Sequence, residues 1–200
     1  MYNIMAHQNT TRRYVGTSLL TALAVVTATL KIHIPYPILP YLKFDLTEIP
    51  IFIVLVFYGL KLSTISSVVY WVILLGIGEF TPIGPTMKFL AILSMLIGYT
   101  IGYRIARSNI TGLVCSIIVR VIVMSLMNYI VLELLIPGGL DWAVSFISRI
   151  LGLEMTSYYE KFVTLLVFTA IFNTIHTVIV VLPSNYIVLL LVRRLRLIVS

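Results

Sequence analysis

Charged side chains are scarce in this 200-residue chain: Asp, Glu, Lys and Arg make up 10% of it, and only seven residues are acidic. A soluble domain has about one quarter of its residues charged. Hydrophobic residues make up 60% of the chain, and its mean hydropathy is +1.08. This composition excludes an ordinary water-soluble fold and predicts an integral membrane protein.

Cysteine is nearly absent, and the common catalytic motifs are missing. Cys115 is the single cysteine, so an intramolecular disulfide is excluded. The sequence has no G-x-S-x-G, H-E-x-x-H or Walker-type GK(S/T) motif, and its three histidines, His7, His33 and His176, are scattered. We therefore expect no enzyme activity, no metal site and no cofactor. Uphill movement of a solute would need energy from a partner or from an ion gradient.

Apolar runs, separated by short clusters of charge, Pro and Gly, indicate the fold class. At a rise of about 1.5 Å per residue, most of these runs are long enough to span a hydrocarbon core about 30 Å thick. We predict one all-α transmembrane domain over residues 1–200, a bundle of about six helices. The predicted spans are 14–31, 48–60, 64–78, 87–105, 112–136 and 162–192, the last bent at Pro183.

Two longer connections separate the spans. Residues 32–47 contain three prolines, which exclude a continuous helix, so we expect an extracellular loop or lid there. Residues 137–161 are expected to form an extracellular loop that carries an interfacial helix, because Trp142, Phe146 and Ile150 recur at helical spacing.

Basic residues gather at alternate ends of the runs, and this asymmetry predicts the orientation. With residues 1–13 as a cytoplasmic segment, both termini are cytoplasmic and the chain is a multi-pass protein of the cell membrane. The basic residues then on the cytoplasmic side are Arg12, Arg13, Lys61, Arg104, Arg107, Arg193, Arg194 and Arg196. Because they lie at the ends of apolar runs, and not along one polar face, the expected partner is the lipid bilayer and not nucleic acid.

Several polar side chains lie within or at the ends of spans, where burial in lipid is costly. Asn128 lies roughly 12 Å below the outer end of the fifth span, and Asn173 and His176 lie one turn apart on the last span at a similar depth. They predict either a polar binding site or hydrogen bonds that only join helices. Arg120 lies deeper and is expected to pair with a carbonyl or to snorkel inward, whereas Lys88 is an interfacial anchor or a pocket rim residue.

Ala24 and Ala28 are four residues apart on the first span. Such a small-xxx-small pattern lets another helix approach closely. The approaching helix belongs either to a partner subunit or to the same bundle, and the pattern alone favours neither.

Four segments together resemble the substrate-binding S component of energy-coupling factor (ECF) vitamin transporters, most closely the riboflavin-binding branch. They are YLKFDLTEIP at residues 41–50, IGPTMKFLAILSMLIG at 83–98, MSLMNY at 124–129 and FNTIH at 172–176. The segments occur in the order found in that family and cover most of the chain.

The resemblance implies a subunit that binds riboflavin from outside and delivers it inward with an ATP-driven module of a transmembrane coupling subunit and two ATPases. It implies that the loop at 41–45 closes over the ligand and that Asn128 and Asn173 hydrogen-bond the flavin or its ribityl chain. His176 departs from the family pattern, which usually has Lys at this position. The expected substrate-binding residues are Tyr41, Lys43, Asp45, Lys88, Asn128, Asn173 and His176, and the expected docking residues are Ala24 and Ala28.

Two alternatives to riboflavin uptake are open at this point. The departure at His176 favours an S component for a different small vitamin or a purine-like compound. A structural membrane protein that uses its polar residues only to join helices is the other alternative.

Overall fold

The computed structural model describes residue 4 and residues 9–199, with side chains described as far as Arg194. His7, much of the expected cytoplasmic segment 1–13 and the side chain of Arg196 lie outside the described residues.

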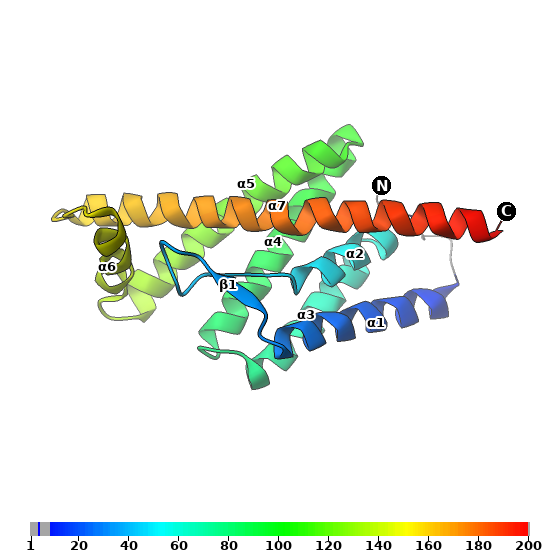
Figure 1. Cartoon of the computed structure of the whole chain (residues 1–200), viewed down its shortest axis with the longest axis horizontal. Coiled ribbons are helices and arrows are strands. Elements are labelled where there is room, and N and C mark those ends of the chain that lie inside the picture. Colours follow the sequence, from blue (N-terminus) through cyan, green and yellow to red (C-terminus); the bar gives the residue numbers. More distant parts are fainter. Residues whose placement is uncertain (1–3, 5–8, 200) are drawn as a thin grey trace.

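The described chain is nearly all helical (Figure 1). In chain order its elements are α1 (Thr10–Thr29), β1 (His33–Pro35), β2 (Lys43–Asp45), α2 (Glu48–Tyr58), α3 (Leu60–Ile77), α4 (Ile83–Ala106), α5 (Asn109–Tyr129), the π-helical turn η1 (Ile130–Leu135), α6 (Gly139–Leu151) and α7 (Tyr158–Val199). The expected all-α class is confirmed, and the short hairpin β1–β2 is an addition that the sequence did not predict.

Four helical stretches of the described chain are long and apolar enough to cross a membrane: Leu60–Ile77, Ile83–Ala106, Asn109–Leu135 and Tyr158–Arg194. α1, with 20 residues, and α2, with 11, complete a bundle of six helices besides α6. α2 extends only about 16 Å by helical rise. All of its residues except Ile49 are buried, so the other helices surround it.

The outer face of α5 is apolar and exposed. Ile110, Val114, Ile118, Ile122 and Leu126 recur every four residues, and each is between 46% and 75% exposed. Exposure of such a continuous apolar stripe to water is unfavourable, and it indicates that this face of α5 contacts lipid.

α6 and α7 differ from the sequence expectation in detail. α6 buries Leu140, Val144 and Ile147 and exposes Trp142, so its apolar residues face both the protein and the surroundings. α7 continues through Pro183 as one unbroken helix, and the expected bend is not seen in the view of Figure 1. The start of α1 and the end of α7 lie at one end of the molecule, and α6 lies at the other (Figure 1).

Two buried apolar clusters hold the bundle together. The first surrounds α2, where the ring of Phe52 packs edge-on against Tyr99 of α4. The second joins the hairpin to α6 and α7, and it includes the fully buried Leu39 together with Ile147 and Phe172. The second cluster positions the hairpin beside the polar residues of α5 and α7.

Candidate functional site

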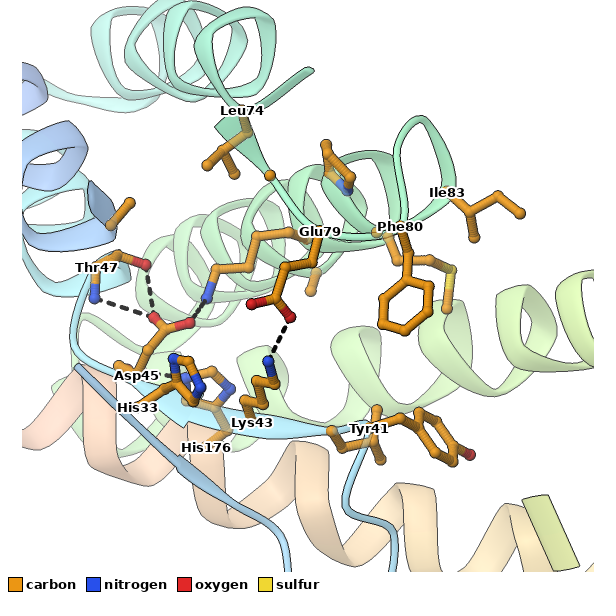
Figure 2. Close-up of a pocket in the computed structure, with 18 of the residues that line it drawn as sticks. His33, Tyr41, Lys43, Asp45, Thr47, Leu74, Glu79, Phe80, Ile83 and His176 are labelled. Atoms are coloured by element: carbon orange, nitrogen blue, oxygen red, sulfur yellow. Dashed lines mark hydrogen bonds and ion pairs between the residues drawn. The ribbon is translucent and has the colours of Figure 1, made fainter. Parts of the chain in front are cut away.

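The hairpin β1–β2 covers the candidate site. Its strands are antiparallel, with His33 opposite Asp45 and Ile34 opposite Phe44. At the last residue of β2, the Asp45 carboxylate accepts hydrogen bonds from the backbone N–H of Thr47, at 3.0 Å, and from its hydroxyl, at 2.5 Å (Figure 2). A side chain of Asp commonly bonds the backbone two residues further on. This turn ends the strand at the start of α2.

A cavity of about 500 Å³ lies beneath the hairpin, between α1, α3, α4, α5 and α7. Its volume falls within the range of about 300–1,000 Å³ typical of small-molecule sites. The residues predicted from the sequence to bind substrate all line it: Tyr41, Lys43, Asp45, Lys88, Asn128, Asn173 and His176. The fold therefore brings residues of four elements to one cavity, and their role in binding stays a prediction.

A buried ion pair forms the floor of this cavity. Arg120 of α5 and Glu48 of α2 are 1% and 0% exposed. Nη1 of Arg120 donates to Oε2 of Glu48 at 2.6 Å, and Nη2 donates to Oε1 at 3.2 Å. The expectation that Arg120 pairs with a carbonyl or snorkels inward is therefore wrong: a guanidinium in an apolar bundle is better stabilised by a bidentate carboxylate than by one carbonyl.

Lys88 of α4 connects the floor to the hairpin. Its ammonium lies 2.5 Å from Oδ2 of Asp45 and 3.1 Å from Oε1 of Glu48. Of the two roles left open for Lys88, the pocket position is the one observed. Burial raises the pKa of the Asp45 carboxyl, but the charge and hydrogen bond of Lys88, together with His176, outweigh burial, so this pKa lies below its ordinary value. Asp45 therefore stays ionised, and the hairpin is held to α4 by an ion pair.

Asn173 and His176 of α7 complete the polar floor. The Asn173 side chain accepts from Nε of Arg120 at 3.2 Å and donates to the Thr169 carbonyl at 2.8 Å. Nδ1 of His176 lies 3.2 Å from Nη2 of Arg120, and Nε2 lies 3.1 Å from the Asp45 carbonyl oxygen. Arg120 thus contacts both α7 residues that the sequence singled out.

Two buried polar atoms of the cavity have no hydrogen-bond partner among the described residues. They are Nδ2 of Asn128 and the hydroxyl of Tyr41. Burial raises the pKa of Tyr41, so its hydroxyl is a neutral donor and acceptor. A buried polar group without a partner costs about 1–3 kcal/mol. Both residues line the cavity, so these two atoms are the candidates for hydrogen bonds to a polar ligand.

The rim of the cavity carries a more exposed ion pair. Nζ of Lys43, on the hairpin, lies 2.5 Å from the carboxylate of Glu79, in the α3–α4 connection (Figure 2). This hydrogen bond lowers the pKa of Glu79. Because both side chains are partly exposed, solvent screens the pair and its contribution is small, roughly 0–1 kcal/mol.

Apolar side chains form the walls. Met124, Leu132 and Phe172 line the cavity, and the rings of Tyr41 and Trp142 lie 5.1 Å apart at one side of it. Apolar walls with a few fixed polar groups are typical of sites for small molecules. Within the described residues, no group of three His, Cys, Asp or Glu side chains could hold a metal ion.

The expected docking pair on α1 faces inward in this structure. Ala24 is completely buried in the cluster around α2, and Ala28 lines the cavity. Ala24 can contact a partner subunit only if α1 moves away from α2. Ala24 is thus packed within the bundle, and a docking role for Ala24 and Ala28 stays a prediction.

Glu48 is a site residue that the sequence did not predict. It lies at the first position of α2, where an acid is ordinarily explained by the positive end of the helix. The one indication in the sequence was that Glu48 lies within the segment 41–50 that resembles the S-component family. Its partner Arg120 is 72 residues away, and one sequence does not show such a pairing.

Comparisons with known proteins agree with this geometry. The family model described as the substrate-specific component of ECF transporters matches residues 12–189. A solved structure described as "Structure and mechanism of the S component of a bacterial ECF transporter" superimposes with a TM-score of 0.67 and 26% sequence identity, covering 96% of this chain and 99% of the other.

A curated relative adds a substrate name. The "Riboflavin transporter RibU" of Staphylococcus aureus (strain TCH60) is 35% identical over 126 residues, which are 60% of this chain and 65% of that protein. The match therefore spans slightly less than two thirds of the relative's length.

Proposed function

This chain belongs to the family of substrate-specific components of ECF transporters, and from that premise we propose that it binds riboflavin and delivers it across the cell membrane. The observation that carries the proposal is the cavity beneath the hairpin, which gathers the residues that the sequence singled out. The substrate name of the S. aureus relative supports the choice of riboflavin.

The chemistry of riboflavin suits this cavity. Its ring is flat and largely apolar, as are the walls around Met124, Leu132 and Trp142. Its ring edge carries carbonyl and imine acceptors, and its ribityl chain carries hydroxyls. The unpartnered Asn128 amide can donate to the acceptors, and the Tyr41 hydroxyl can donate or accept. Binding would remove two desolvation costs that the ligand-free protein carries.

Transport would require partners, because the sequence holds no nucleotide-binding motif. We assign this role to a transmembrane coupling subunit and two ATPases, as expected for the family. In the proposed orientation, the ends of α1 and α7 that carry Arg12, Arg193 and Arg194 face the cytoplasm, and the hairpin faces outward.

A vitamin panel tests the substrate. Purified protein is mixed with riboflavin or with other small vitamins and purines, and its melting temperature is measured. Since a ligand present at 100 times its Kd stabilises the folded state by about 2.7 kcal/mol, riboflavin should raise the melting temperature clearly. Stabilisation by a different vitamin, with none by riboflavin, would assign the cavity to that compound instead.

A further inference from the structure

Arg120 has no donor left for a ligand, although it lines the cavity. A guanidinium carries five N–H donors and no acceptor. Nε donates to Asn173; Nη1 lies 2.6 Å from Glu48 and 3.6 Å from the sulfur of Met95; and Nη2 lies 3.2 Å from both Glu48 and His176. Each of the five N–H donors therefore has an acceptor within the protein. Arg120 therefore organises its neighbours instead of binding substrate.

This arrangement determines where His176 carries its proton. Because Arg120 can only donate, Nδ1 of His176 must accept and is unprotonated. Nε2 faces two acceptors, the Asp45 carbonyl at 3.1 Å and Oε1 of Glu48 at 3.8 Å. The proton consequently lies on Nε2, and the imidazole is neutral.

We propose that His176 is a positioning residue for the hairpin: Arg120 holds it as the Nε2–H tautomer, and that N–H holds β2 closed through the Asp45 carbonyl. Asp45 is then fixed on both sides, since its carboxylate is held by Lys88 and Thr47 and its carbonyl by His176 (Figure 2). The link joins the hairpin to α7 in the same way that Lys88 joins it to α4. This inference deepens the proposed function, because it assigns His176 to the lid over the substrate cavity and not to the substrate.

The roles around the cavity are thereby divided. Asn173 has its oxygen occupied by Arg120 and one N–H by Thr169, which leaves one N–H for a ligand. Asn128 has its whole NH₂ group unpartnered among the described residues. The two asparagines thus present donors to the substrate, whereas both ring nitrogens of His176 are engaged by the protein.

The tautomer can be measured directly on the wild-type protein. Protein labelled with ¹⁵N-histidine is purified without ligand, and a long-range ¹H–¹⁵N spectrum reports the protonation of each ring nitrogen. The signal that is lost in His176→Gln identifies His176 among the histidines. A neutral ring with the proton on Nε2 is expected. A proton on Nδ1, or a doubly protonated ring, would overturn the proposal, and neither result depends on riboflavin or on a destabilised variant.

Lid mobility provides the second readout. Ile34, exposed on β1, is replaced by Cys for a spin label in a Cys115→Ser background, and spectra are recorded without ligand. His176→Leu should mobilise the label, and His176→Gln should restore the wild-type spectrum because Gln offers both a donor and an acceptor. The matched control Asn128→Leu, which alters the same cavity without contacting the hairpin backbone, should leave the label immobile.

The rate of riboflavin dissociation distinguishes a His176 that holds the hairpin from a His176 that contacts the ligand. His176→Leu should accelerate riboflavin dissociation by about tenfold, which corresponds to about one lost hydrogen bond. Riboflavin should dissociate from His176→Gln at a rate close to that from the wild-type protein. An immobile hairpin in His176→Leu together with weakened binding would show that His176 contacts the ligand and would overturn the proposal. If riboflavin does not bind the wild-type protein at all, the proposed function fails, while the tautomer and mobility results still decide the role of His176.

Discussion

At the scale of single residues, the cavity is distinguished by buried polar atoms that lack a hydrogen-bond partner among the described residues. Nδ2 of Asn128 and the hydroxyl of Tyr41 are buried without a hydrogen-bond partner among the described residues, whereas Arg120 in the same cavity has every donor engaged. Native proteins rarely leave buried polar atoms unpaired, so such atoms at a cavity indicate a place for a ligand.

Replacing Asn128 by Leu should weaken riboflavin binding about tenfold or more, through loss of a hydrogen bond to the ligand. The melting temperature of the ligand-free protein should stay the same or rise, because an unpaired amide is removed from the interior. Fluorescence titration and thermal unfolding measure the two effects. A fall in melting temperature with unchanged affinity would identify Asn128 as a residue that only joins helices.

Asn185 supplies the matched control for this substitution. It lies on α7 outside the cavity lining and accepts a hydrogen bond from the Tyr99 hydroxyl at 3.2 Å. Asn185→Leu should lower the melting temperature and leave the riboflavin affinity unchanged, which is the opposite pattern.

The ion pair between Lys43 and Glu79 predicts a pH dependence of the lid. The pKa of Glu79 in the folded protein is lowered from its ordinary value of 4.5. The stabilisation of the lid by this ion pair is therefore fully present above about pH 4.5, and it is lost as the pH falls through the pKa of Glu79 in the folded protein. Riboflavin dissociation should therefore be constant from about pH 8 to pH 5 and accelerate only in stronger acid. Because the pair is partly exposed, Glu79→Gln should accelerate dissociation by less than about fivefold at neutral pH, and high salt should mimic it. Acceleration that begins near pH 7 would point to a different titrating group.

At the scale of elements, the cavity depends on how closely α4 and α5 approach, since α4 carries Lys88 and α5 carries Asn128 and Arg120. A Cβ on Gly98 would lie 2.6 Å from the carbonyl oxygen of Cys115 and 2.8 Å from Cα of Ser116, both backbone atoms of α5. Only glycine permits this approach, so the packing of the two helices sets the width of the site.

Gly98→Ala should therefore force α4 and α5 apart, destabilise the protein by about 1–3 kcal/mol and weaken riboflavin binding as well. Gly76→Ala is the control, because a Cβ at Gly76 meets nothing within 4 Å. An alanine there should leave binding unchanged and stabilise α3 by up to about 1 kcal/mol. Equal melting temperatures for the two variants would show that the α4–α5 contact does not constrain the site.

At the scale of the whole molecule, the features that could be predicted from the sequence are those that depend on local residue patterns. The bundle was predictable because apolar runs report membrane helices, and Asn128, Asn173 and His176 were recognisable because each interrupts such a run. The pairing of Glu48 with Arg120 was not, because it depends on how α2 and α5 lie in space. The β1–β2 hairpin was also missed, since its strands are three residues long and lie within a proline-rich segment.

The distribution of basic residues predicts the orientation of the molecule, and labelling of intact cells tests this prediction. In a Cys115→Ser background, Ile34→Cys on the hairpin should react with a membrane-impermeant maleimide added outside, whereas Lys61→Cys, at the opposite end of the bundle, should react only after the cells are opened. The reverse pattern would place the cavity mouth toward the cytoplasm and would exclude uptake from outside in the proposed manner.

The fluorescence of riboflavin itself reports whether the cavity beneath the hairpin holds this molecule. Riboflavin is titrated with purified protein while its emission is recorded. We expect saturable quenching at micromolar or lower concentration for the wild-type protein, with a loss of affinity of about tenfold or more in Asn128→Leu and none in Asn185→Leu. Unquenched emission at every protein concentration, or quenching that Asn128→Leu leaves unchanged, would contradict the binding of riboflavin in this cavity.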